Sequence, residues 1–154
     1  MKKQHTKPII YTPQHGFSLV EVLIALAVLS IGLLGLAALQ TVSLKVGHDS
    51  YQRTQATMLA YDIVDRMRAN PVALAAGKYN SVTVGTNPGS TDCVSASCNT
   101  DQLADYDIRS WHSILAAKLS QGQGSITTSG STRTITVLWS ENDLPIRLQL
   151  IVQL

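Results

Sequence analysis

A single carboxylate, Glu21, lies in an otherwise apolar run that directly follows the Gly16-Phe17 junction. A charged side chain at the centre of a membrane helix costs roughly 2.5–3.5 kcal/mol on insertion scales, so such groups are rare and are usually paired. The chemistry that these residues suggest is ion pairing with a cation. Glu21 therefore needs a partner that the apolar run itself does not supply.

The apolar run is long enough to cross a membrane. No charged residue occurs from Val22 through Leu44. Its most apolar part, Val22–Leu39, would cross most of a bilayer core about 30 Å thick as a helix. Three cations precede the run, at Lys2, Lys3 and Lys7. The first cation after it is Lys45, so the positive-inside rule predicts a cytoplasmic N-terminus.

Two ordinary interpretations explain this N-terminus less well. A secretory signal peptide has an apolar region of about 7–15 residues, and this run is longer. A plain single-span anchor explains the length. It does not explain the Gly16-Phe17 junction, or why Glu21 comes before the apolar stretch.

The segment GFSLVEVLIAL resembles the start of a type IV prepilin. The resemblance implies that a prepilin peptidase cuts after Gly16 and methylates the amine of Phe17. Residues 1–16 would then be a leader peptide, and Glu21 would be the fifth residue of the mature chain. In a filament of apolar helices, the Glu21 carboxylate of one subunit can meet the cationic amine of its neighbour and fix the axial register.

The chain after the apolar run predicts one small domain. About 110 residues suffice for a single core. An apolar stripe at helical spacing comprises Ala56, Leu59, Ala60, Ile63, Val64 and Met67. Asn70-Pro71 should end this helix, which would run from Phe17 to Ala69. Three ion pairs are expected on its polar face: Asp49 with Arg53, Asp62 with Arg66, and Asp65 with Arg68.

The remainder predicts mixed secondary structure. A strand is expected around Tyr79–Val84 and a second helix over Gln102–Leu119. A short strand at Ser125–Thr128 and two alternating strands, Thr134–Trp139 and Ile146–Leu154, should form an antiparallel meander. The fold class is α+β: a sheet on the distal half of a long N-terminal helix, which matches the pilin ladle fold. The predicted parts are the leader at 1–16, the membrane and assembly segment at 17–44, and the periplasmic domain at 45–154.

Cys93 and Cys98 lie in a polar segment, 85–101, that is rich in Gly, Ser, Thr and Asn and reads as a surface loop. A domain beyond the inner membrane faces an oxidising compartment, which favours a disulfide between them. Zinc is the competing interpretation. It needs about four ligands, and only His48 and His112 remain after the leader, neither at metal-ligand spacing. Alkylation without reductant would separate the two.

Composition argues against an enzyme and against nucleic-acid binding. Residues 1–16 hold three of the twelve cations and no acids, so removing them changes the formal charge from +2 to −1 and leaves no basic stripe. No nucleophile motif or phosphate loop occurs. Asp105 and Asp107 are expected on different sides of a helix, at the surface. The prediction is therefore no catalytic activity, no cofactor and no metal.

Further segments resemble the minor pilins of the PilV type: RTQATMLAYDIVDRMRANP at 53–71, WHSILAAKL, GQGSI and ITVLW. This resemblance implies a subunit that joins other minor pilins in a tip or priming complex, with the major pilin and the inner-membrane assembly platform as further partners. The filament and the cell surface would be its final location. Two alternatives remain open: a type II secretion pseudopilin, which shares the N-terminal signature, and an adhesin subunit that displays the 85–101 loop at a fibre tip.

Overall fold

The computed structural model describes residues 16–154. Helix α1 (Leu19–Ala69) begins two residues later than predicted and ends at the predicted position. The boundary between two compact units falls within it, between Leu44 and Lys45. Helix α1 is long and apolar enough, by length and composition, to cross a membrane. Every residue from 16 to 44 is solvent-exposed, so the described part of the first unit has no core of its own.

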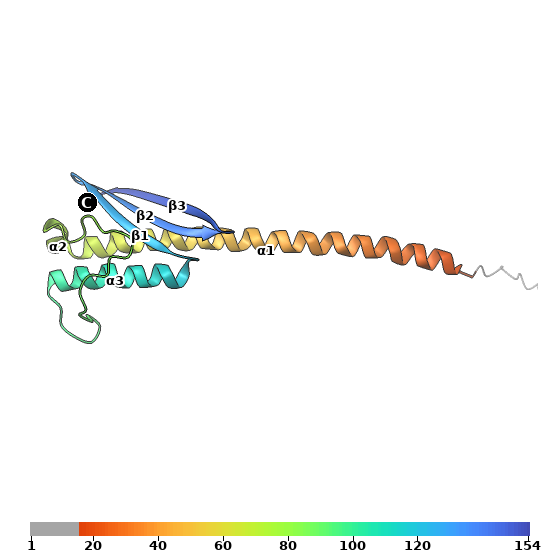
Figure 1. The fold of residues 1–154 in the computed structure, drawn as a ribbon, viewed down its shortest axis with the longest axis horizontal. Coiled ribbons are helices and arrows are strands. Elements are labelled where there is room, and N and C mark those ends of the chain that lie inside the picture. The colour runs from red at the N-terminus through yellow and green to blue at the C-terminus, as the bar shows by residue number, and fades with distance from the viewer. Residues whose placement is uncertain (1–15) are drawn as a thin grey trace, which may run out of the picture. The chain divides into compact units, whose positions relative to one another are not determined.

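The second unit, Lys45–Leu154, contains all the other helices and strands of the described chain. After the C-terminal part of α1 come α2 (Pro71–Ala75) and α3 (Thr100–Lys118). Strands β1 (Gln123–Ser129), β2 (Thr132–Glu141) and β3 (Leu144–Gln153) follow as an antiparallel sheet in the order β1-β2-β3 (Figure 1). The predicted α+β class, with a meander after a long helix, is confirmed.

The core of this unit lies between α1, α3 and the sheet. All six residues of the predicted α1 stripe are buried. They pack with Trp111 and Leu115 of α3 and with the inward side of β2. The Trp111 indole donates a hydrogen bond from Nε1 to the carbonyl oxygen of Leu59, 2.9 Å away. This buried bond satisfies the one polar group of the largest core side chain and fixes α3 against α1.

The turns of the sheet follow local backbone preference. Asn142 and Asp143 have φ values of +53° and +63° and connect β2 to β3 as the two central residues of a tight hairpin. Asn and Asp tolerate this left-handed conformation, which matches the twist of the strands. Pro145 lies within β3, where its missing N–H is tolerated because β3 is an edge strand.

Strand β1 approaches α3 so closely that two glycines are required. A Cβ built on Gly124 would lie 2.5 Å from Leu115 Cδ1 and closer still to Trp111 Cη2. A Cβ on Gly122 would collide with the Leu115 carbonyl and lie 2.8 Å from Leu119 Cβ. The GQGSI segment thus brings the backbone of β1 into contact with the aromatic core of α3.

The predicted strand at Tyr79–Val84 is wrong. The segment consists of turns, with Ser81 at a φ of +56° and a single bridge between Val82 and Ile126. Tyr79 and Val82 are both buried, three residues apart, whereas a strand would have placed them on opposite faces. The backbone turns so that both side chains enter the core.

The other segment boundaries are close to the predictions. Asn70 follows the last residue of α1 and accepts a hydrogen bond from the Ala73 amide as the N-cap of α2. Helix α3 begins two residues before the predicted start because Asn99 caps it. The Asn99 side chain accepts from the Gln102 amide, and the Gln102 side chain accepts from the Asn99 amide. This reciprocal pair is a capping box.

Candidate assembly site

The predicted site residues at the N-terminus lie together at the start of α1. Phe17 is 83% exposed and precedes the helix, while Glu21 lies in its first turn. The Glu21 amide donates to the carbonyl oxygen of Ser18. An acid in the first turn is favoured by the positive end of the helix dipole. Gly16 is described, but the rest of the predicted leader, residues 1–15, lies outside the described residues.

Glu21 has no cationic partner among residues 16–154. The side chains around it on α1 are apolar and exposed, including Val20, Val22 and Leu23. A lone carboxylate on such a surface can be stabilised in a water-poor environment only by a cation from another molecule or by the chain's own N-terminus. The arrangement suits contacts between subunits.

The second predicted site is the loop with the two cysteines. Cys93 and Cys98 form a disulfide, with their Cα atoms 5.5 Å apart. This is the pairing that the sequence favours over a zinc site, and residues 16–154 contain no cluster of three metal-ligand side chains. Arg109 of α3 anchors the preceding residues because its guanidinium donates to the carbonyl oxygens of Pro88, Gly89 and Thr91. The Arg109 side chain thus holds the backbone of the loop against α3, in addition to the covalent connection of the loop to the start of that helix.

The expectation that Asp107 lies at the surface is wrong. Its side chain is buried and accepts a hydrogen bond from the Tyr79 hydroxyl, with 2.7 Å between the oxygens. Arg66 of α1 approaches its other carboxylate oxygen at 3.5 Å. Burial, together with the hydrogen bond to Asp107, raises the pKa of Tyr79 above its ordinary value of 10.0. Asp107 therefore joins α1, the 76–82 turns and α3, and it has a structural role.

The predicted ion pairs on α1 are partly correct. Arg66 pairs with Asp62, and Arg68 pairs with Asp65, as expected. Arg53 instead pairs with Glu141 at the end of β2, with 3.0 Å between Nη2 and Oε2. Glu141 is buried and also accepts from the Trp139 indole at 2.9 Å. The hydrogen bond from Arg53 is the main reason that the pKa of Glu141 lies below its ordinary value.

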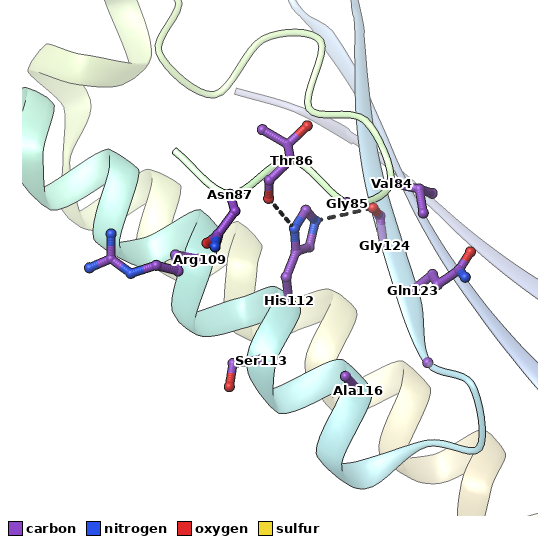
Figure 2. Close-up of a pocket in the computed structure, with 11 residues that line it drawn as sticks. Val84, Gly85, Thr86, Asn87, Arg109, His112, Ser113, Ala116, Gln123 and Gly124 are labelled. Carbon is purple, nitrogen blue, oxygen red and sulfur yellow. Dashed lines mark hydrogen bonds between the residues drawn. The ribbon is translucent and has the colours of Figure 1, made fainter. Parts of the chain in front are cut away.

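One cavity lies between α3, β1 and residues 84–87, with a volume of about 520 Å³ (Figure 2). His112 of α3 lies at its wall, with ring nitrogens close to the carbonyl oxygens of Thr86 and Gly124. Arg109 also lines the cavity, although its guanidinium is occupied by loop carbonyls. Sequence reasoning considered His112 only as a metal ligand, since nothing in the sequence shows that two distant backbone carbonyls meet at its ring.

Comparison with known families agrees with this architecture. Residues 38–109 match the family model described as Tt1218-like, type IV pilin Tt1218. Residues 12–37 match the model of the prokaryotic N-terminal methylation motif. No curated protein and no solved structure matched the chain.

A long N-terminal helix with an apolar span and a C-terminal three-stranded sheet are consistent with the type IV pilin fold, and the methylation motif agrees with it. The central region, residues 38–109, is similar to the Tt1218-like type IV pilins. The motif implies processing by a prepilin peptidase and a place in a pilus or pseudopilus. Type IV pilins are structural proteins, and an apolar helix near the N-terminus suggests the membrane anchoring that is typical of pilins.

Proposed function

We propose that this chain is a minor pilin of the PilV type, which is incorporated into a type IV pilus or primes its assembly within a minor-pilin tip complex. The observation that carries the proposal is the first unit. Residues 16–44 form an exposed apolar surface on which Glu21 is the one charged group. Such a surface is stable in lipid or among the helices of other subunits, whereas its exposure to water is unfavourable.

Maturation is proposed to occur at the Gly16-Phe17 bond. Gly16 is exposed, a Cβ added to it would meet no atom of the described residues within 4 Å, and Phe17 is exposed beside it. A peptidase could therefore reach this bond on the cytoplasmic side of the membrane. Cleavage would leave Phe17 as the new N-terminus, whose amine is then methylated and remains cationic.

Glu21 is proposed to pair with the Phe17 amine of an adjoining subunit during assembly. Both charges would be poorly solvated among apolar helices, and each alone would be costly there. A subunit displaced along the filament axis would leave both unpaired. The pair therefore stabilises one register and disfavours the others, which is the best-supported use of a buried ion pair.

The proposed topology places residues 1–16 in the cytoplasm and the domain at 45–154 in the periplasm, followed by transfer to the fibre. The lysines before the span and the disulfide in the domain support this orientation. Other minor pilins, the major pilin and the inner-membrane platform are the proposed partners.

The test compares Glu21→Ala with Gln40→Ala, a change of a polar residue to alanine on the same exposed helix. Sheared filaments are collected, and the chain is quantified in the filament and membrane fractions. We expect Glu21→Ala to remain in the membrane and Gln40→Ala to enter filaments. Equal incorporation of both variants would remove the pairing role. Mass spectrometry of the native N-terminal peptide should show methylated phenylalanine.

Deletion of the chain distinguishes a pilus subunit from a type II secretion pseudopilin. Loss of surface pili with normal exoprotein secretion is the expected result. Loss of secretion with normal pili would assign the chain to the secretion machinery. Normal pili that fail to attach to host surfaces would favour the tip adhesin.

A further inference from the structure

Strand β3 has an outer edge whose backbone groups are free. Directly after β3, the Leu154 amide donates to the carbonyl oxygen of Ser131, so the even-numbered residues of β3 direct their backbone groups to β2. The odd-numbered residues direct theirs away from β2, as the antiparallel pattern requires. Within residues 16–154, no other segment forms a backbone hydrogen bond with them. The outward-directed residues are Pro145, Arg147, Gln149, Ile151 and Gln153.

The opposite edge of the sheet is covered by the chain itself. In β1, the Ile126 amide donates to the carbonyl oxygen of Val82 at 2.8 Å. The carbonyl oxygen of Gly124 lies 3.1 Å from Nε2 of His112. The turns before α3 and α3 itself therefore occupy the edge of β1, and β3 is the edge that stays open in the described chain (Figure 1).

The apolar layer beneath the sheet is incomplete at β3. On the face of β2 toward the core, side chains such as Ile135 and Val137 are fully buried. Their cross-strand neighbours on β3, Leu150 and Leu148, belong to the same row but are only partly buried. One more strand beside β3 would cover this row. Its other partly buried members are Ile146, Val152 and Leu154.

Strand β3 also lacks most of the features that protect an edge strand. Edge strands are usually short, interrupted by a bulge, or marked by charged residues and proline. The ten residues of β3 pair with β2 without a bulge. Pro145 and Arg147 lie near the hairpin turn, and the segment Leu148–Leu154 contains neither proline nor charge. A long apolar edge of this kind is a template for pairing with another chain.

We propose that the outer edge of β3 binds an extended segment of another pilin subunit, which adds a further strand to the sheet. This inference rests on the proposed function, because it takes the partner from the same assembly. The free N–H and C=O groups require an extended backbone as their partner. The partly buried row requires apolar side chains at every second position of that segment, on the side that faces the core.

A second copy of this chain fits the edge less well than a different subunit. Pairing of two β3 edges would use the same patch on both copies, so it would be a twofold-related contact. Subunits of a filament repeat through heterologous contacts instead. A segment from a different subunit needs no twofold axis, and it is the occupant to which the proposal commits.

The test is photo-crosslinking in cells that assemble the native filament. A photo-reactive amino acid replaces Ile151, which is 67% exposed on the outer face of β3, or Thr127, an exposed residue of β1, as the control. Mass spectrometry identifies the cross-linked peptides. We expect position 151 to cross-link to a segment of another pilin subunit and position 127 not to do so. The inference would be overturned by equal cross-linking at both positions, by cross-links only between copies of this chain or to a protein that is not a pilin, or by none.

Gln149→Pro tests the backbone pairing itself. It removes an N–H that points away from β2, and Pro145 shows that this strand accepts proline at such a position. Gln149→Ala is the matched control, because it keeps the N–H and loses the same side-chain contact with Thr136. We expect Gln149→Pro to lower the yield of the position-151 cross-link by about fivefold or more, and Gln149→Ala to leave it unchanged. Equal yields would contradict strand pairing.

Folding of the proline variant is checked by urea unfolding of the full chain in micelles. If Gln149→Pro fails to fold, Gln153→Pro repeats the test at another outward-directed amide. Failure of both to fold would show that these amides are needed within the domain, which would overturn the inference.

The wild-type chain in sheared filaments reports on the proposed function separately. Its presence there without the expected cross-link would overturn the inference about β3 and leave the proposed function standing. Its absence from filaments would overturn the proposed function, and the inference about β3 with it.

Discussion

Replacement of Gly124 by alanine tests the packing of the sheet on α3 directly. The added Cβ would lie 2.5 Å from Leu115 Cδ1, and closer to Trp111 Cη2. Carbon atoms prefer separations of about 3.5–4.0 Å, so β1 or the Trp111 ring must move by about 1 Å or more. Both neighbours are fully buried, and Trp111 is also bonded to Leu59, which leaves little room for a flexible adjustment.

The expected cost of Gly124→Ala is about 3 kcal/mol, at the upper end of the range for overpacked cores. For a domain of this size, that lowers the melting temperature by at least about 10 °C. Thermal unfolding of the full chain in micelles can be followed through the fluorescence of Trp111 and Trp139, which both belong to the core.

Gly47→Ala is the matched control, because a Cβ there meets nothing within 4 Å and Gly47 lies within helix α1. It should raise stability slightly, by up to about 1 kcal/mol. The double variant Gly124→Ala with Trp111→Phe removes the colliding ring atoms, so it should cost less than the sum of its two parts. A melting temperature for Gly124→Ala equal to that of wild type would refute the close-packing argument.

Three further perturbations have expected outcomes. Tyr79 has a raised pKa, so its contribution to stability is complete below pH 10.0 and is lost at higher pH. Tyr79→Phe should thus be less stable than wild type at pH 8, with a smaller difference at pH 11, in urea unfolding. Glu141 has a lowered pKa, so its contribution is present above pH 4.5 and is lost in acid. Glu141→Gln should show a flatter acid dependence in the same assay, and an unchanged slope would contradict it. Replacing Cys93 and Cys98 by serine should cost about 2 kcal/mol by chain entropy, measured as a lower unfolding midpoint, and should leave the pairing of β1 with β2 intact.

The parts of the fold with clear periodicity could be predicted from the sequence. The six-residue stripe of α1 and the alternation along β2 reflect local repeats that one buried face imposes. The antiparallel order of the strands could be predicted because segments of turn-forming residues, such as 141–145, separate them. The candidate assembly residues also stand out in the sequence, because Glu21 is the one charged residue next to a long apolar run, and their role stays a prediction.

The parts that depend on contacts between distant segments could not be predicted. Asp107 was expected at the surface because its buried partner, Tyr79, is 28 residues away in a segment without regular structure. Arg53 was assigned to Asp49 by spacing, whereas its partner is Glu141, 88 residues further on. The i,i+4 pairing rule considers only residues of the same helix. It cannot predict that the end of β2 brings the Glu141 carboxylate next to Arg53.

The exposure of every residue from 16 to 44 has a consequence for how this protein tolerates mutation. A segment that buries none of its own side chains contributes no cooperative unfolding signal. Substitutions there should therefore leave the melting curve of the protein unchanged. Selection on these positions must act through their contacts with lipid or with the helices of other subunits. The pattern of tolerated substitutions should therefore differ between the two parts of one continuous helix. Up to Leu44, the effect of a substitution would depend on the contacts made in the assembly. From Lys45 onward, it would depend on the stability of the domain itself.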